Sequence, residues 1–147
     1  MLGRWPFQIE LPVQWGDMDA NRHVNNTAYQ RWFESGRVEY FARIGAMAGS
    51  ATGPVIVRLT MHWRLALRWP DRVRSAATVV RIGDTSFTMA QRLHSLANDG
   101  AIAAEAEGVL VWLGPDGRKQ RVPDDVRRRI EELESTAPAR EGPPQGT

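Results

Sequence analysis

The chain has 147 residues, 19 basic and 17 acidic side chains, a formal net charge of +2 and no cysteine. This length favours a single domain, which buries about two thirds of its unfolded surface. The absence of cysteine excludes disulfides, thiolate metal sites, iron–sulfur clusters and cysteine nucleophiles, and it fits a reducing, cytoplasmic compartment. The longest uncharged run, residues 44–57, contains three glycines and a proline, so it falls short of a membrane span of about 20 apolar residues. The first six residues lack the apolar stretch of a signal peptide.

The basic residues, 18 arginines and Lys119, are spread along the whole chain. Residues 127–129 form the one arginine cluster, and Glu131, Glu132 and Glu134 follow it directly. This pattern is typical of a solvent-exposed helix face with ion pairs. A nucleic-acid-binding domain would carry a concentrated basic face, so the charge pattern argues against a nucleic-acid partner.

The N-terminal part of the chain predicts one strand followed by a loop. Residues 7–15 alternate apolar and polar side chains, as a half-buried strand does. Pro12 has no N–H to donate, so we expect it at an edge or unpaired position. Residues 16–26 are polar and aperiodic, which predicts a loop.

A long helix is predicted from about residue 26 to residue 44, because apolar side chains recur there at helical spacing. Asn25 or Asn26 is the expected N-cap. Gly36 lies on the apolar face, where a glycine costs about 1 kcal/mol relative to alanine. We therefore expect the helix to approach a sheet closely at Gly36.

The second half of the chain predicts four long strands joined by tight turns, over residues 55–67, 73–82, 86–96 and 101–113. A change of parity near Val79 predicts a β-bulge. Residues 123–134 predict a short helix, with a proline and two acids in its first turn. Residues 135–147 are rich in proline and glycine and lack large apolar side chains, so we expect a disordered tail.

This order of elements predicts an α+β fold in which one face of an antiparallel sheet covers the long helix. The predicted domain spans residues 1–134. Six tryptophans fall mostly in apolar registers, which predicts core positions. Trp15 and Trp63 are also candidates for lining a pocket.

The best candidates for catalytic residues lie in segment 17–26, which holds two carboxylates, one imidazole and several amides. It leads into a helix N-terminus, whose free N–H groups suit an anion or a developing oxyanion. The loop either caps the backbone, or binds calcium, or presents a catalytic carboxylate to an oxyanion site. Asp17, Asp19 and Asn21 match the first three ligand positions of an EF-hand loop. However, Arg22 replaces the required glycine, and the final glutamate is absent.

Other catalytic patterns are missing from the sequence, which contains neither G-x-S-x-G nor H-E-x-x-H. His62 and His94 fall on different strands, and we expect both to be ordinary polar strand residues. Glu105 and Glu107 share one strand face, and a solvated face is the simpler interpretation of that pair.

Several segments resemble the 4-hydroxybenzoyl-CoA thioesterase-like hotdog family, and more narrowly its acyl-CoA thioesterase branch with the pattern D-x-D…H-V-N-N. The similarity covers about residues 7–134. The segments that carry it are Trp15–Asp19, His23–Tyr29, Trp32–Glu34, Arg37–Glu39, Arg81–Gly83, Ser86–Phe87 and Val109–Trp112. The resemblance implies a hotdog fold, in which a five-stranded antiparallel sheet wraps a long central helix and a short C-terminal helix follows.

The resemblance also implies roles for residues of the helix-entry loop. Asp19 matches the carboxylate that acts as nucleophile or general base. The backbone N–H of Asn26 matches the group that polarises the thioester carbonyl. His23, Asn25 and the Asn26 side chain would orient the carboxylate, water or carbonyl. The substrate-binding residues expected on this basis are Trp15, Tyr29, Ser86 and Phe87.

Two positions depart from the family pattern. Many relatives have glycine where this chain has Arg22, so the arginine either takes a different backbone path or reaches toward the ligand. Some relatives have basic residues in the turn before Ser86, near the phosphates of coenzyme A, whereas this chain has Asp84 and Thr85. The second departure leaves acyl carrier protein open as the carrier of the acyl group.

The expected reaction is hydrolysis of an acyl-CoA or acyl-ACP thioester, with no metal or cofactor beyond the thioester substrate. A hotdog hydratase or dehydratase using His23 as acid–base partner, and a non-catalytic acyl-thioester binder, remain alternatives. Family members pair their sheets as dimers with active sites at the interface, and many form tetramers. We therefore expect a homodimer assembled into a homotetramer, since an unpaired five-stranded sheet leaves exposed edges.

Overall fold

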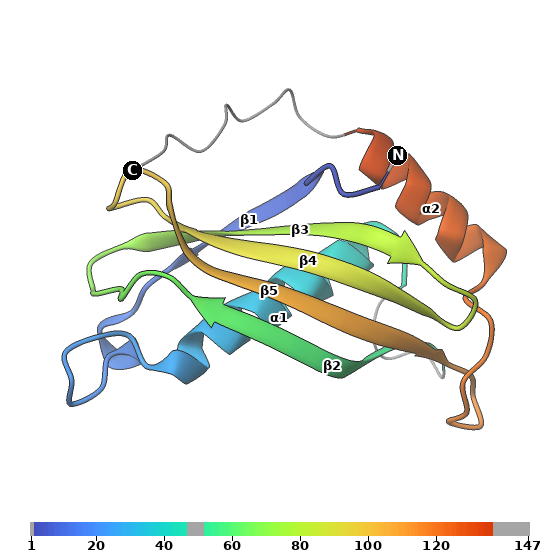
Figure 1. Cartoon of the computed structure of the whole chain (residues 1–147), viewed down its shortest axis with the longest axis horizontal. Coiled ribbons are helices and arrows are strands. Elements are labelled where there is room, and N and C mark those ends of the chain that lie inside the picture. Colours follow the sequence, from blue (N-terminus) through green and yellow to red (C-terminus); the bar gives the residue numbers. More distant parts are fainter. Residues whose placement is uncertain (1, 47–51, 137–147) are drawn as a thin grey trace.

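A computed structural model describes residues 2–46 and 52–136 of the chain. Over these residues it contains five strands, two α-helices and one 3₁₀ turn. In chain order the elements are β1 (Phe7–Pro12), η1 (Trp15–Asp17), α1 (Asn26–Arg43), β2 (Gly53–Trp63), β3 (Arg72–Ile82), β4 (Ser86–Ser95), β5 (Ala101–Leu113) and α2 (Asp124–Ser135). The predicted α+β hotdog fold, with its long central helix, is confirmed (Figure 1).

The five strands form one sheet in the order β1-β3-β4-β5-β2, and every neighbouring pair is antiparallel. The sheet curves around α1, and α2 lies at one end of it (Figure 1). β1 and β2 are the two edge strands. Pro12 therefore lies on an edge strand, as its missing N–H predicts.

The close approach predicted at Gly36 is confirmed. A Cβ atom at this position would lie 2.6 Å from the Ser75 hydroxyl of β3, closer than real Cβ contacts allow. The helix and sheet also exchange hydrogen bonds here. Ser75 Oγ donates to the Trp32 carbonyl at 3.1 Å, and Gln91 Nε2 donates to the Phe33 carbonyl at 2.8 Å. The N-terminal half of α1 is therefore fixed against β3 and β4.

Two clusters of buried apolar side chains lie between α1 and the sheet. The cluster around the C-terminal half of α1 also receives α2 and includes Tyr40, Phe41, Phe87, Met89, Leu110, Trp112, Val126 and Ile130. The cluster around the N-terminal half includes Val24, Tyr29, Trp32, Phe33, Leu67, Val73 and Leu93. The second cluster supports the segment that carries the candidate catalytic residues.

The prediction that most tryptophans are core residues is wrong. Trp32 and Trp112 are buried, whereas Trp15, Trp63 and Trp69 are 71%, 44% and 48% exposed. Trp15 is exposed because β1 ends at Pro12, before the predicted end at residue 15, and the chain then turns into η1.

The regular alternation predicted for residues 55–67 is also interrupted. β2 ends at Trp63, and its register with β5 shifts between Ile56 and Arg58. Such a bulge inserts one residue and reverses which face the following side chains occupy. The bulge predicted near Val79 is present, since the register of β3 with β4 shifts between Val79 and Arg81.

The prediction of a fully solvated face on the C-terminal helix is wrong at Glu134. This side chain is fully buried, although Arg128 and Glu132 do form an exposed ion pair. Glu134 accepts hydrogen bonds from Val79 N at 2.6 Å, Thr78 Oγ1 at 2.8 Å, Tyr40 Oη at 2.9 Å and Arg4 N at 3.3 Å. One carboxylate therefore joins the N-terminal segment, α1, β3 and α2.

The predicted disordered tail lies almost entirely outside the described residues. α2 extends to Ser135 and is followed by Thr136, whose hydroxyl donates to the Leu133 carbonyl at 2.7 Å. Residues 137–147 are not described. No helix in the described ranges is both long and apolar enough to cross a membrane.

Candidate active site

The loop before α1 folds back on itself as a short two-stranded ladder. Met18 and Val24 form an isolated antiparallel bridge. On either side of the bridge, Asp19 N donates to the His23 carbonyl at 3.0 Å, and Asn25 N donates to the Asp17 carbonyl at 2.8 Å. These bonds hold the carboxylate-bearing arm of the loop beside the first residues of the helix.

Asp17 anchors this ladder to the rest of the protein. It is buried, and its two carboxylate oxygens accept hydrogen bonds from Gln14 N at 2.8 Å and from the guanidinium of Arg31 on α1. Because the group is buried and paired with Arg31, Asp17 is placed to position the loop rather than to react.

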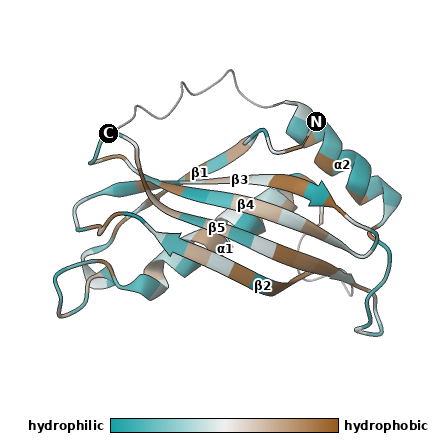
Figure 2. Ribbon diagram, in the orientation of Figure 1, coloured by the Kyte–Doolittle hydropathy of each residue, from teal (hydrophilic) through white to brown (hydrophobic). Residues whose placement is uncertain are grey.

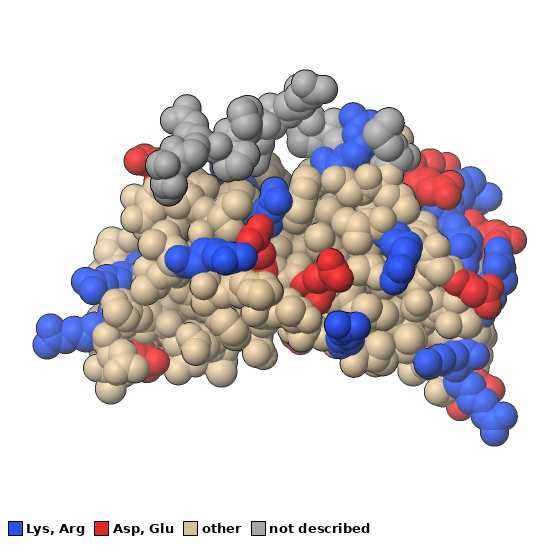
Figure 3. All heavy atoms as spheres, in the orientation of Figure 1, with Lys and Arg blue, Asp and Glu red and all other residues tan. Residues whose placement is uncertain are grey.

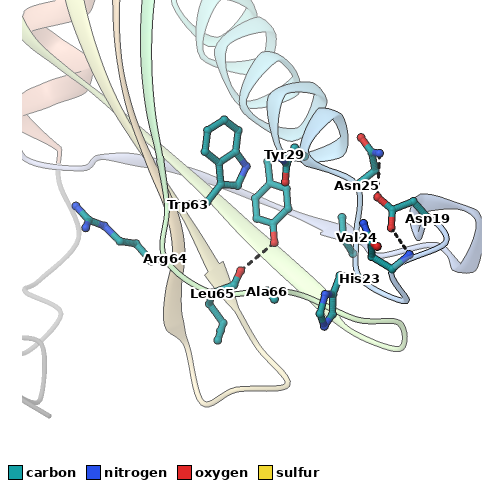
Figure 4. A pocket seen from close by; sticks show the side chains of 11 residues that line it. Asp19, His23, Val24, Asn25, Tyr29, Trp63, Arg64, Leu65 and Ala66 are labelled. Atoms are coloured by element: carbon teal, nitrogen blue, oxygen red, sulfur yellow. Dashed lines mark hydrogen bonds between the residues drawn. The ribbon is translucent and has the colours of Figure 1, made fainter.

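Asp19 has the opposite environment. Its side chain is exposed and forms no ion pair among the described residues. Oδ1 accepts a hydrogen bond from Asn21 N at 2.9 Å, and Oδ2 accepts one from Asn25 Nδ2 at 3.1 Å (Figure 4). Two donors fix the direction of the carboxylate, and each oxygen retains a lone pair for a reacting group.

The start of α1 leaves one backbone donor free beside this carboxylate. Asn25 is the N-cap: its side-chain oxygen accepts from Thr27 N at 2.9 Å, and its carbonyl accepts from Ala28 N at 2.9 Å. Asn26 N has no hydrogen-bond partner anywhere in the described part of the chain. The helix dipole adds about half a positive charge at this end, so the free N–H suits an oxygen that gains negative charge.

An open groove of about 480 Å³ connects this loop with the end of β2. One wall is polar and comes from the loop and the start of α1: Asp19, Asn21, His23, Val24, Asn25 and Asn26. The other wall comes from α1 and from the chain that leaves β2: Tyr29, Trp63, Arg64, Leu65 and Ala66 (Figure 4). A polar reacting end therefore faces a largely apolar and aromatic wall.

Tyr29 supports the apolar wall. Its hydroxyl donates to the Leu65 carbonyl at 2.9 Å and accepts from Leu67 N at 3.2 Å. Burial raises the pKa of Tyr29, so it stays neutral in these bonds. The ring lines the groove while the hydroxyl fixes the chain between β2 and β3.

The structure brings most of the predicted site residues together. Asp19, His23, Asn25, Asn26 and Tyr29 all line the groove. The ring of His23 points away from Asp19, and its Nε2 lies 3.1 Å from the guanidinium of Arg68 (Figure 4). An arginine only donates, so Nε2 is the acceptor in this contact. His23 contributes to Asp19 through its backbone carbonyl instead.

Three predicted substrate-binding residues lie outside this groove in the single chain. Trp15 is exposed on η1, and Ser86 begins β4. Phe87 is buried in the cluster that receives α2 and contacts Phe41 edge-to-face. Their substrate-binding roles stay predictions.

Residues 64–66 were not predicted as site residues, and the ion pair of Asp17 with Arg31 was not predicted either. Residues 64–66 follow the last residue of β2, where no motif marks them. Asp17 was recognisable as a second carboxylate in the same short loop. Its ion pair, however, is with Arg31, which lies in the second turn of α1. Trp63, a candidate for lining a pocket, does line the groove.

Arg22 adopts a backbone conformation that is typical of glycine. Its φ angle is +60°, and its N–H donates to the Asp19 carbonyl at 3.0 Å to close a turn. This left-handed conformation is one that glycine adopts without cost. A glycine could therefore take the same backbone conformation at this position.

Other polar groups have structural partners. His94 Nδ1 lies 3.0 Å from the Gly100 carbonyl, and Glu105 pairs with Arg64 and Arg92. Within residues 2–46 and 52–136, no group of three or more His, Asp or Glu side chains is placed to hold a metal ion. Basic and acidic side chains are interspersed on the face that Figure 3 shows.

Comparisons with known proteins agree with this geometry. A model of the thioesterase-like superfamily matches residues 13–130. A putative thioesterase from Pseudomonas aeruginosa is 32% identical, with a TM-score of 0.79 over 88% of this chain and 99% of that chain. A Thermus thermophilus thioesterase, solved as a complex with coenzyme A and zinc, is 29% identical, with a TM-score of 0.79 over 90% of this chain and 96% of that chain.

One curated relative is a chloroplastic acyl-acyl carrier protein thioesterase from Arabidopsis thaliana, which is 29% identical over 127 residues. The match covers 84% of this chain and 66% of the relative, so the chain spans just under two thirds of that protein's length. These relatives support the expected class of reaction, the hydrolysis of acyl thioesters.

Proposed function

Because the chain belongs to the thioesterase-like superfamily, we propose that it hydrolyses an acyl thioester of coenzyme A or acyl carrier protein to a free acid and a thiol. One observation carries the proposal for the site. An exposed, oriented carboxylate (Asp19) and a free helix N-terminal N–H (Asn26) lie on the same wall of one groove. Thioester hydrolysis needs a nucleophile or base and a donor for the oxyanion. It needs no strong general acid, because the thiolate is a good leaving group.

In the proposed reaction the thioester carbonyl oxygen accepts a hydrogen bond from Asn26 N–H. Asp19 then either attacks the carbonyl carbon, forming an acyl-enzyme anhydride that water hydrolyses, or removes a proton from a water that attacks. In both routes the C–S bond breaks and the thiolate leaves with the electron pair. Removing one oxyanion-hole donor costs about 100–1000-fold in turnover in a serine protease, which indicates the scale of the Asn26 contribution.

The aromatic and apolar wall suits the acyl group. The Tyr29 ring, Trp63 and Leu65 lie opposite the polar loop, so an acyl chain entering from the thioester would contact them (Figure 4). Burying apolar surface contributes about 25 cal/mol per Å², which supplies affinity without reactive groups.

A homodimer is part of the proposal. The edge strand β2 exposes large apolar side chains that a single chain leaves uncovered: Val55, Val57, Leu59 and Trp63, each 36–58% exposed. Figure 2 shows hydrophobic colouring in the part of β2 nearer its start, whereas the arrowhead end is more hydrophilic. Edge strands of this kind are normally paired or protected. Sedimentation at micromolar concentration should give a mass of at least twice 16.5 kDa, and a 16.5 kDa species would contradict the dimer.

Thiol release from short, long and aromatic acyl-CoA esters, and from the matching acyl-ACP esters, tests the activity. We expect turnover on at least one ester. A hydratase would instead consume enoyl-CoA without releasing thiol, and a non-catalytic binder would bind CoA esters without turnover. The ring of His23 points away from Asp19 and contacts Arg68, which favours hydrolysis over a hydratase that uses His23 as acid–base partner.

A further inference from the structure

Arg22 combines an unfavourable backbone conformation with a charge that has no partner in the described part of the chain. Three non-glycine residues in the described ranges have left-handed φ angles: Trp5, Arg22 and Asp99. The left-handed region of backbone conformations is disfavoured for most residues other than glycine, asparagine and aspartate. The three positions differ in which local feature offsets the cost of the left-handed backbone.

Two of these positions are compensated locally. Asp99 belongs to a residue type that tolerates the left-handed region, and it lies in the tight turn between β4 and β5. Trp5 stacks on the guanidinium of Arg92, with 4.4 Å between that group and the ring centroid. The exposed Arg22 side chain forms no hydrogen bond or ion pair with any described residue. No contact with residues 2–46 or 52–136 therefore accounts for an arginine at this turn.

Arg22 belongs to the loop that forms the polar wall of the groove. It stands between Asn21 and His23, which both line the groove, whereas Arg22 itself is not among the lining residues. Of the lining residues, Asp19 alone is acidic. Arg68 forms a hydrogen bond with His23. Arg64 lines the opposite wall and forms a salt bridge with Glu105 at 3.2 Å.

Arg64 lines the groove and Arg22 and Arg68 lie beside it in sequence or contact, and of these three Arg22 is the one without a partner among the described residues. Guanidinium groups bind phosphate oxygens through paired, charge-assisted hydrogen bonds.

We infer that Arg22 binds the phosphate that ends the pantetheine arm of the substrate's carrier. This inference rests on the proposed thioesterase function, because that phosphate is common to coenzyme A and acyl carrier protein. The groove then has three functional parts: Asp19 and Asn26 at the thioester, the wall with Tyr29 and Trp63 at the acyl group, and Arg22 at the carrier. Arg22 is a recognition residue and takes no part in bond breaking.

The central experiment compares Arg22→Gly with the wild type on two substrates carrying the same acyl group. One is the acyl-CoA ester, and the other is the N-acetylcysteamine ester, which has no phosphate. Arg22→Gly should raise KM for the CoA ester about three- to tenfold, leave kcat unchanged and leave the N-acetylcysteamine kinetics unchanged. The KM difference should shrink at high salt, because exposed charge interactions are screened.

Glycine suits the left-handed backbone at this position, so the variant is expected to fold and to retain its Tm. Asp99→Gly is the matched control. It makes the same type of backbone substitution at a turn outside the groove, and it should leave KM for both esters unchanged. An acyl-ACP arm separates the carriers: a higher KM on acyl-ACP alone assigns the contact to the carrier-protein phosphate, and one on acyl-CoA alone assigns it to coenzyme A.

An unchanged KM for both carrier esters in Arg22→Gly would overturn the inference and leave the thioesterase function intact. Calorimetric titration with coenzyme A itself tests the phosphate contact even if the protein hydrolyses no ester. If the wild type binds coenzyme A but hydrolyses no ester, a several-fold weaker Kd in Arg22→Gly supports the phosphate contact while the proposed hydrolysis fails. An equal Kd in that case overturns the contact as well.

Discussion

Two carboxylates at opposite ends of α1 serve different purposes, and their surroundings explain why. Glu134 on α2 is fully buried and accepts four hydrogen bonds, and these bonds link α2 to the N-terminal segment, α1 and β3. Asp19 is exposed, accepts two, and retains lone pairs that face a groove. A saturated carboxylate stabilises a fold, whereas an oriented and partly unsatisfied one is available for chemistry.

Asp19→Asn should have the largest effect on activity. The substitution keeps the size of the side chain and removes its charge and basicity. We expect kcat to fall about 100–10,000-fold with little change in substrate binding, because general bases contribute on that scale. Steady-state kinetics on the best thioester, together with thermal unfolding, would measure both effects.

The Tm of Asp19→Asn should remain near the wild-type value, since the side chain is exposed. Near-normal turnover in this variant would remove Asp19 from the reaction, and Glu34 on α1 would become the next carboxylate to test.

Glu134→Ala should show the reverse pattern. The substitution leaves the donors of Tyr40, Thr78 and Val79 buried without their acceptor, so we expect a loss of about 3–5 kcal/mol in the free energy of unfolding. The kcat of the folded fraction should stay close to wild type.

Urea unfolding with activity measured below the transition separates stability from catalysis for Glu134→Ala. Glu132→Ala, at an exposed position on the same helix, is the control and should cost less than about 0.5 kcal/mol. A large loss of kcat in the folded Glu134 variant would contradict the distinction between the two carboxylates.

Local patterns in the sequence predicted the features that depend on neighbouring residues. The helix from about Asn26, an N-cap at Asn25 or Asn26 and the packing role of Gly36 all follow from spacing and residue type within one element, and the structure places the N-cap at Asn25. The loop before α1 was likewise recognisable, because its acids, imidazole and amides are contiguous.

Features that depend on distant segments were not predictable in the same way. Glu134 resembles any solvated helical glutamate until Arg4, Tyr40 and Val79 converge on it. The bulge after Ile56 leaves no mark, since valine and isoleucine suit either face of a strand. Residues 64–66 enter the site only because Tyr29 fixes their backbone from α1.

Asp17→Asn tests a carboxylate between the two extremes. Asp17 is buried like Glu134 but belongs to the same loop as Asp19. The amide keeps one acceptor and loses the charge that pairs with Arg31, so we expect a loss of about 1–2 kcal/mol in stability. We also expect a fall in kcat milder than that of Asp19→Asn, with KM little changed, because the loop positions Asp19.

Arg31→Met provides the matched test for Asp17, because it removes the cation of the same pair from the other side. If Asp17 acts by positioning, the double variant should lose less than the sum of the two single variants, as coupled partners do. Strict additivity would show that Asp17 acts on the reaction independently of its anchor.

Tyr40→Phe gives the smallest expected effect and concerns pH. Burial, and then the Glu134 carboxylate, raise the pKa of Tyr40 above its ordinary value of 10.0. The folded state therefore keeps a phenolic proton that the unfolded chain releases above pH 10, and stability falls as the pH rises beyond that value. Tyr29, the second of the two tyrosines, contributes in the same direction.

Removing Tyr40 should make the alkaline decline of the unfolding free energy shallower by about 1.4 kcal/mol per pH unit, the value for one proton. At pH 7 the variant should lose about 1 kcal/mol, because Glu134 keeps three of its four donors. Urea unfolding at intervals between pH 9 and pH 12 measures this slope. An unchanged slope would show that the Tyr40 hydroxyl is not held neutral by its buried contact with Glu134.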